Sequence, residues 1–181
     1  CHETATVGED VRVLRPVDRL EFVATACRGR TVLDLGAMDE TAYGQKHGRG
    51  TWLHERIAAV AKAVVGVDSS TVVPDEGVVT APNARIVRGD VDRIDALLDA
   101  IDFQPDVVVA GELIEHVPSP LAFLQRLRHS TRLAGCTLIL TTPNATAAHN
   151  VAVGLLSRES THRDHLCILS YKTLHTLSAR A

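Results

Sequence analysis

Short runs of apolar residues alternate along this chain with stretches in which apolar residues recur at helical spacing. The runs contain few polar interruptions, and this pattern is typical of strands that are buried on both faces of a parallel sheet. The pattern predicts five strands, which are Thr31–Leu35, Val64–Val67, Ala84–Val87, Asp106–Ala110 and Cys136–Leu140.

Helices are predicted between these strands and near both ends of the chain. Ser119 offers a side-chain cap to the first backbone amides of a helix, and Pro120 suits the first turn of that helix. The other predicted helices are Pro16–Cys27, Trp52–Ala63, Ile94–Ile101 and Ser170–Ala179. Strands that alternate with helices predict an α/β fold with a Rossmann-like, doubly wound and mostly parallel sheet and helices on both of its faces.

The composition fits one ordinary domain. The chain has 181 residues, of which 45% are hydrophobic, and its formal net charge is −3. We expect a single domain over 1–181, with an N-terminal helical segment (1–30) and a Rossmann-like core (31–181). The negative charge argues against nucleic acid as the main partner, and no apolar run approaches the roughly 18 residues of a membrane span. The four cysteines have no metal-type spacing, so we expect a reducing, cytoplasmic location.

Glycines and polar residues follow the predicted strands. Ligands of open parallel sheets bind beyond the carboxyl ends of the strands, so these positions form the candidate site. They are Asp34 to Ala37, Asp68, Gly89-Asp90, Gly111 to His116 and Thr142 to Asn144. A glycine turn with several carboxylates suits a ligand that carries hydroxyls, an amine and a positive charge. Phosphate or dinucleotide sites are disfavoured, because G-x-x-x-x-G-K-[ST] is absent and G-x-G-x-x-G does not follow the first strand.

These segments resemble the motifs of class I S-adenosylmethionine (SAM)-dependent methyltransferases, in order and over about residues 31–177. The segment from Asp106 to Val117 is the strongest match, because it contains E-x-I-E-H, a signature of a subgroup with many small-molecule O- and N-methyltransferases. The other similar segments are 32–37, 65–68, 89–91, 138–144 and 164–166. Two features depart from the family. Only Gly36 remains of its D-x-G-x-G-x-G loop, and the chain is too short for the two strands that follow the last helix.

The resemblance implies SAM as the cofactor and gives roles to nine residues. Those expected at its amino-acid end are Asp34, Gly36 and Ala37. Those expected at its ribose are Asp68 and the adjacent Ser69, and those expected at its adenine are Asp90 and Val91. Gly111 and Glu112 are expected to flank the sulfonium.

Methyl transfer to a hydroxyl benefits from a base near the reacting oxygen, and histidine suits that role. His116 follows the fourth strand and is the candidate base, although it could instead hydrogen-bond its own loop. The sequence thus predicts an enzyme that methylates an oxygen of a small-molecule acceptor, and no metal site is assigned.

Two alternatives remain open. Glu112, Glu115, His116 and a downstream histidine resemble the metal-binding set of small-RNA 3′-terminal 2′-O-methyltransferases, which favours a metal-assisted RNA methyltransferase. The shortened glycine loop favours a non-catalytic domain that keeps the fold as a binding module. A dependence of activity on metal would support the first alternative, and a failure to bind SAM would support the second.

Overall fold

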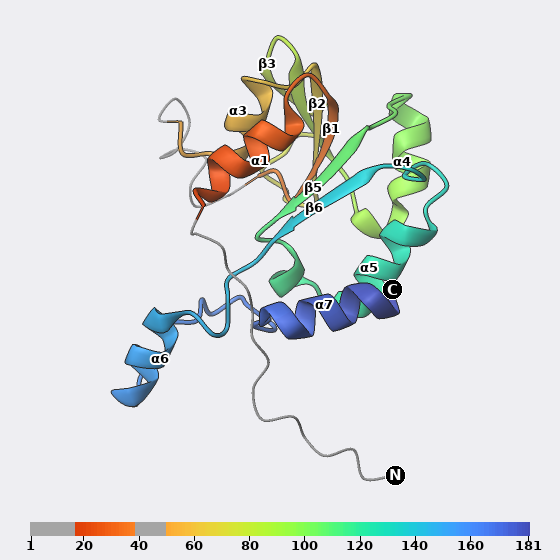
Figure 1. Cartoon of the computed structure of the whole chain (residues 1–181). Helices are drawn as coiled ribbons and strands as arrows, with labels where there is room; N and C mark the ends of the chain where they lie inside the picture. Colours follow the sequence, from red (N-terminus) through yellow and green to blue (C-terminus); the bar gives the residue numbers. More distant parts are fainter. Residues whose placement is uncertain (1–16, 39–49) are drawn as a thin grey trace.

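The computed structural model describes residues 17–38 and 50–181 (Figure 1). Within them, six strands form one sheet in the order β3-β4-β2-β1-β5-β6. The strands are β1 (Thr31–Leu35), β2 (Ala63–Asp68), β3 (Val78–Ala81), β4 (Ala84–Arg88), β5 (Val107–Gly111) and β6 (Thr137–Thr141). Among the described strand pairs, only β3 and β4 run antiparallel. The predicted α/β fold with a mostly parallel sheet is confirmed.

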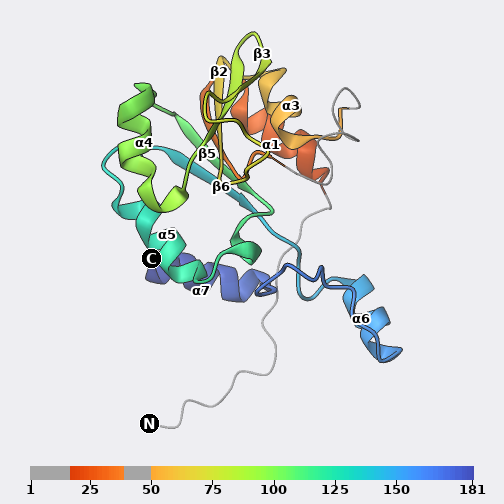
Figure 2. The same cartoon turned by 180° about the vertical axis from the view of Figure 1, so that it is seen from behind.

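Helices cover both faces of the sheet (Figures 1 and 2). The helices are α1 (Arg19–Cys27), α3 (Leu53–Ala58), α4 (Ile94–Ile101), α5 (Pro120–His129), α6 (Ala148–Leu155) and α7 (Tyr171–Arg180), with 3-10 turns η1 (Val91–Arg93) and η2 (Ile114–His116). Val32 packs with α1 and α3 in one core, and its neighbour Leu33 packs with α4 and α5 in the other. In the part of the chain that the structure describes, no helix has the length and apolar character needed to cross a bilayer.

The helix starts largely follow their capping residues. The Ser119 hydroxyl accepts a hydrogen bond from the Ala122 amide (3.4 Å) at the start of α5, and α7 begins directly after Ser170. Both starts agree with the sequence. Helix α1 begins at Arg19, and the predicted start at Pro16 lies outside the described residues.

The predicted helix Trp52–Ala63 is too long, because α3 ends at Ala58. The chain beyond α3 is held by the turn between α1 and β1. The Lys62 amide donates to the Arg30 carbonyl (2.8 Å), and the Val60 carbonyl accepts a bond from the amide of the same turn's glycine (2.9 Å). These contacts compete with further helical bonds and direct the chain into β2.

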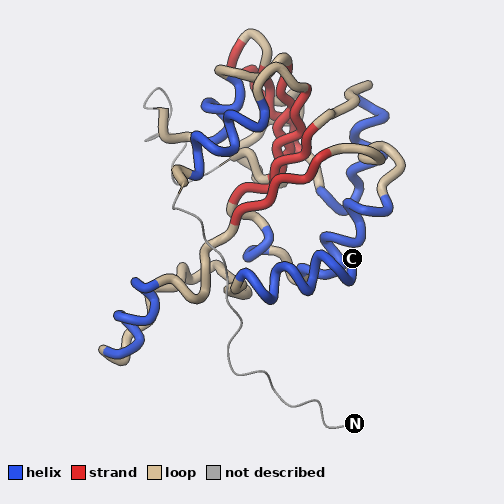
Figure 3. The backbone as a smooth tube through the Cα atoms, in the orientation of Figure 1, coloured by secondary structure: helices blue, strands red, loops and turns tan. Residues whose placement is uncertain are grey.

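The sequence pattern predicts neither β3 nor α6, and the two elements share a lack of buried apolar residues. Strand β3 lies at the sheet edge with Val79 76% exposed. Helix α6 contains no buried residue and projects away from the sheet (Figure 3). Asn144 and Leu169 form an isolated parallel bridge, so residues 145–168 leave the fold and return at one place. We call this segment the outer excursion.

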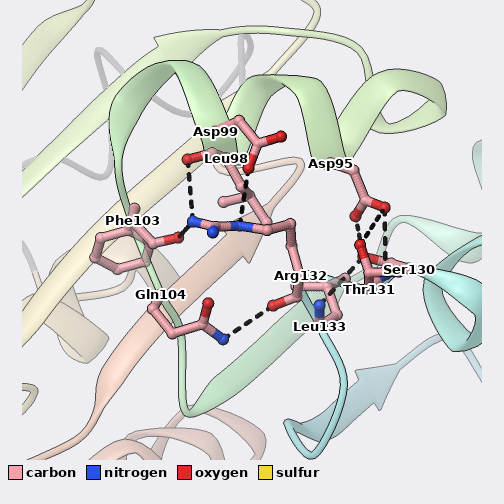
Figure 4. A network of polar contacts seen from close by, with 9 residues as sticks. All are labelled: Asp95, Leu98, Asp99, Phe103, Gln104, Ser130, Thr131, Arg132 and Leu133. Atoms are coloured by element: carbon pink, nitrogen blue, oxygen red, sulfur yellow. Dashed lines mark hydrogen bonds and ion pairs between the residues drawn. The ribbon is translucent and has the colours of Figure 1, made fainter.

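A polar network ties α4 to the loop between α5 and β6 (Figure 4). Asp95 accepts hydrogen bonds from the Ser130 hydroxyl and from the Thr131 amide (3.2 Å). Arg132 Nε lies 3.3 Å from Asp99 Oδ1. Burial alone would raise the pKa of Asp95, but the hydrogen bonds from the α5–β6 loop outweigh it and lower that pKa. We call this set the α4 network.

Candidate active site

A cavity of about 620 Å³ opens at the carboxyl ends of β1, β2 and β5. Seven of the ten predicted site residues line it, namely Asp34, Gly36, Ala37, Asp68, Gly111, Glu112 and His116. The parallel register explains why they meet, because Leu35 at the end of β1 lies beside Val67 of β2 and Ala110 of β5. A cavity of this size suits a cofactor or another small ligand.

The turn after β1 needs glycine for two reasons. Gly36 has φ +70°, in the left-handed region that side chains disfavour, and an added Cβ would lie 3.1 Å from Leu113 Cδ1. The next residue, Ala37, is buried, and its carbonyl accepts a hydrogen bond from Trp52 Nε1 (2.9 Å). The turn is therefore fixed in position without the further glycines of the family motif.

The Asp68 carboxylate accepts hydrogen bonds from the loop after β1 and from the loop after β2. Its Oδ2 accepts a hydrogen bond from the Met38 amide (2.8 Å), and its Oδ1 accepts one from the Ser70 amide (2.9 Å). These bonds orient the carboxylate toward the cavity that it lines. The side chain therefore supports the loop after β1 in addition to any contact with a ligand.

Asp34 is held by a histidine that the sequence analysis did not assign to the site. Asp34 and His54 are 2% and 1% exposed, and Asp34 Oδ2 lies 2.9 Å from His54 Nδ1. His54 Nε2 lies 3.0 Å from Thr80 Oγ1 on the edge strand β3. Burial, together with the charge of Asp34, raises the pKa of the neighbouring Cys27 to about 12. That thiol is therefore protonated at neutral pH and unsuited to be a nucleophile.

Three of the predicted cofactor residues do not line the cavity. Ser69 and Asp90 are exposed, and Asp90 accepts a hydrogen bond from the Asp92 amide (2.8 Å), which caps η1. Val91 is half-buried and packs against the core. Ser69 follows Asp68 directly, and Asp90 follows the glycine whose amide donates to the Asp68 carbonyl (2.8 Å). Their contact with adenine stays a prediction.

A strained residue that follows β5 and a cation from α1 meet at the cleft. Glu112 has φ +54°, which is unusual for a residue with a side chain, and its amide donates to the Thr141 carbonyl (2.9 Å). Arg19 Nη1 lies 4.0 Å from Glu112 Oε1. Arg19 is the only Lys or Arg in the described lining of the cavity. No motif marks it, because it reaches the cleft from α1 through the packing of that helix.

His116 lies on η2 with an orientation that leaves one ring nitrogen as an acceptor. Its Nδ1 lies 3.1 Å from the backbone carbonyl of Asp164 in the outer excursion. A carbonyl only accepts hydrogen bonds, so Nδ1 carries a hydrogen, and in the neutral imidazole Nε2 then carries the lone pair. The ring of His165 meets that of His116 edge-on, with centroids 4.8 Å apart.

Glu115 lies beneath this histidine pair and is 0% exposed. Its Oε2 accepts a hydrogen bond from Thr142 Oγ1 (3.0 Å), while Oε1 is buried with no hydrogen-bond partner among the described residues. Burial, reinforced by the charge of Glu112, raises the pKa of Glu115. The metal-assisted alternative names Glu112, Glu115, His116 and a downstream histidine. In the structure, Glu115, His116 and His165 each place one potential ligand atom within 4.8 Å of the others, and Glu112 is not part of this group.

Comparisons with known proteins agree on the fold. The profile of a methyltransferase domain family matches residues 11–181. The YcgJ protein from Bacillus subtilis is 16% identical, with 89% of this chain and 66% of that chain covered and a TM-score of 0.54. A putative SAM-dependent methyltransferase from Streptococcus mutans is 14% identical, with 88% and 37% covered and a TM-score of 0.50. The N-terminal domain of EvdMO1 with S-adenosylhomocysteine (SAH) bound is 17% identical, with 89% and 68% covered and a TM-score of 0.50.

Identities this low show a shared fold and no more, and the chain spans 66% and 37% of the first two structures. No curated protein matches the chain significantly. The E-x-I-E-H subgroup stays a prediction. The family profile, however, covers nearly the whole chain, and the sheet order is typical of the class I SAM-dependent methyltransferase fold. The chain therefore belongs to the methyltransferase domain family, as its strand-end motifs predict.

Proposed function

We propose that this chain transfers a methyl group from SAM to an oxygen of a small-molecule acceptor in the cytoplasm. The observation that carries the proposal is one cavity that combines a glycine turn, acidic strand ends and a histidine with an accepting nitrogen. The carboxylates suit the hydroxyls, amine and sulfonium of SAM. The net charge of −3 favours a small molecule over nucleic acid as the acceptor.

The cofactor would lie along the strand ends. Its amino-acid end would lie at the Gly36 turn, and Arg19, which lines the same cavity beside Glu112, would pair with the methionine carboxylate. Its ribose would lie at Asp68, and its sulfonium near Glu112. Adenine would extend past Asp68 toward the segment that contains Ser69, Asp90 and Val91.

In the proposed reaction, the acceptor oxygen attacks the methyl carbon in line with the carbon–sulfur bond. The electrons of that bond pass to sulfur, so the positive sulfonium becomes the neutral thioether of SAH. The acceptor proton passes to Nε2 of His116, whose other nitrogen is held by the Asp164 carbonyl. SAM already carries the activated methyl group, so positioning supplies much of the rate.

The cofactor site is tested by calorimetric titration of SAH into Asp68→Ala. We expect SAH affinity to fall more than tenfold, because hydrogen bonds to a charged group contribute about 1.5–3 kcal/mol each. Glu76→Ala removes an exposed carboxylate outside the cavity lining and is the matched control. Unchanged affinity in Asp68→Ala would refute the site, and a wild-type protein that binds no SAH would leave the non-catalytic alternative.

The base is tested with His116→Ala and radiolabelled SAM, using a panel of small phenols and hydroxy acids as acceptors. We expect turnover to fall roughly 100-fold with SAH affinity retained. The control His175→Ala removes an exposed histidine of α7 that does not line the cavity. Full activity in His116→Ala would remove this residue as the base.

A further inference from the structure

We propose that His54 is a positioning residue that directs the Asp34 carboxylate at the amino group of the cofactor, so that the cleft selects ligands with an amino-acid end. The inference rests on the proposed function, which places that end of SAM near Asp34. His54 belongs to α3 and Asp34 to β1, and both residues line the cavity. His54 would act through Asp34 and not on the reacting atoms.

The Asp34 carboxylate has one oxygen held by the protein and one oxygen left for a ligand. Its Oδ2 lies 2.9 Å from His54 Nδ1, whereas no described residue donates a hydrogen bond to its Oδ1. The residue is only 2% exposed, yet it lines the cavity. A carboxylate so far removed from water is stabilised by hydrogen-bond donors and by positive charge. A protonated amine supplies both.

The other carboxylates that line the cavity are less suited to bind an amine. Both oxygens of Asp68 already accept hydrogen bonds from backbone amides, and Glu112 lies beside a guanidinium group. Asp164 is exposed, whereas Asp34 is the only buried carboxylate in the described lining. An ion pair is stronger where water is excluded. Asp34 is therefore the carboxylate that would hold an ammonium group most firmly.

The His54 ring is itself held on several sides. An ionised carboxylate only accepts hydrogen bonds, so Nδ1 carries the hydrogen that is donated to Asp34. The other ring nitrogen, Nε2, lies 3.0 Å from Thr80 Oγ1 on β3. The imidazole also lies beside the ring of Trp52, with centroids 5.1 Å apart. Because both nitrogens have partners, the ring cannot turn without losing hydrogen bonds, and its donor stays directed at Oδ2.

Strand β2 leaves the space that the imidazole occupies. Gly66 lies beside Asp34 in the parallel register of β1 and β2. A Cβ at this position would lie 3.0 Å from His54 Cε1 and 2.6 Å from Ala37 Cβ. Glycine weakens the interior of a strand and often marks a close approach of other atoms. Its presence here is explained by the room that the imidazole and the cofactor turn require.

The test is a calorimetric titration with two ligands that differ at the amino-acid end. SAH carries that end, whereas 5′-methylthioadenosine keeps the adenosine and the thioether but ends in a methyl group. In His54→Leu, we expect SAH affinity to fall at least about tenfold and methylthioadenosine affinity to stay within about twofold of wild type. His54→Asn keeps an N–H donor close to the position of Nδ1. This conservative variant should bind SAH at least about threefold more tightly than His54→Leu.

A second variant tests the same arrangement from the edge strand. Thr80→Val removes the hydroxyl that holds Nε2 of His54, so SAH affinity should fall about threefold while methylthioadenosine affinity is unchanged. Thr137→Val is the matched control, because it makes the same change on the opposite edge strand β6, outside the cavity lining. Its affinity for both ligands should equal that of wild type.

Two outcomes would overturn the role of His54. One is an unchanged SAH affinity in His54→Leu, and the other is an equal loss of affinity for the two ligands, which a purely structural role predicts. If His54→Leu fails to fold, as judged by thermal unfolding, the SAH affinity of Thr80→Val relative to Thr137→Val decides the test. A wild-type protein that binds SAH normally in the presence of either overturning outcome refutes this inference alone. A wild-type protein that binds neither ligand refutes the methyltransferase site as well.

Discussion

The cleft and the α4 network, which Figure 4 shows, differ in how their charged side chains are paired. In the network, Asp95 accepts hydrogen bonds from the neighbouring loop. Arg132 pairs with Asp99 and donates through Nη2 to two backbone carbonyls, although its buried Nε has no hydrogen-bond partner among the described residues. At the cleft, Glu115 Oε1 is buried without a partner and Glu112 has a left-handed backbone. Unpaired buried groups and such conformations cost free energy of folding. The difference indicates that the network serves the fold, whereas the cleft holds groups in position for a ligand.

The largest loss of stability is expected at Asp34, which is buried in the core and also lines the cavity. Asp34→Ala would leave His54, which is 1% exposed, without its carboxylate partner. Removal of one member of such a buried pair costs about 3–5 kcal/mol. Denaturant unfolding should show this loss, and calorimetry should show weaker SAH binding.

Asp34→Asn is the matched control for that variant. It keeps the shape of the side chain and one oxygen that can accept from His54. We expect a smaller loss of stability than in Asp34→Ala. If the free energy of unfolding of Asp34→Ala lies within about 1 kcal/mol of the wild-type value, the pair of Asp34 and His54 does not stabilise the fold.

A substitution in the α4 network is expected to cause a smaller loss of stability and no change in SAH affinity. Ser130→Ala removes a hydrogen bond to Asp95, so unfolding at neutral pH should require about 1 kcal/mol less. SAH affinity should be unchanged, because neither residue lines the cavity. Weaker SAH binding in this variant would show that the network and the cleft are coupled.

The same variant has a defined pH dependence. The pKa of Asp95 is lowered below its ordinary 3.8 in the folded chain. Its contribution to stability is therefore present above pH 3.8 and is lost as the pH falls through the folded pKa. The stability difference between wild type and Ser130→Ala should narrow below pH 3.8 in urea titrations. A difference that stays constant to the acid limit would contradict this account of Asp95.

The smallest loss of stability is expected from breaking an exposed ion pair between α3 and α1. Arg56 Nη2 lies 2.9 Å from Glu21 Oε2 between α3 and α1, and these side chains are 39% and 62% exposed. Exposed ion pairs contribute about 0.2–1 kcal/mol and are screened by salt. Arg56→Ala should lower the Tm slightly in dilute buffer and not in concentrated salt. A large decrease in Tm that does not depend on salt would show that the aliphatic part of the Arg56 side chain packs between α1 and α3.

The sequence was most informative where a strand coincides with a continuous apolar run. The five predicted strands are apolar runs, and β1 matches its predicted range. Strand β3 has no long apolar run and helix α6 buries no residue, and both were missed, whereas the edge strand β6 was found from its apolar run although it has no buried residue. The end of α3 could not be predicted either, since it depends on a contact between Lys62 and Arg30 that exists only after folding.

The candidate site also contains some residues that the sequence predicted and others that it did not. The strand-end rule found Gly36, Asp68 and Glu112 because the topology alone brings them together. Arg19 and His54 were missed, since they reach the cleft through helix packing against the sheet. No local sequence motif predicts which helix residues reach the cleft in this way.

The bridge between Asn144 and Leu169 has a consequence for protein engineering. The Ala145 amide donates to the Leu169 carbonyl (3.0 Å), so the outer excursion begins and ends at a single neck. Its helix α6 buries no side chain, while its histidines reach the cleft. The segment is therefore suited to exchange as a cassette: grafts joined at this neck would replace the part of the cavity wall that carries His162 and His165, while the Gly36 turn and the sheet stay intact.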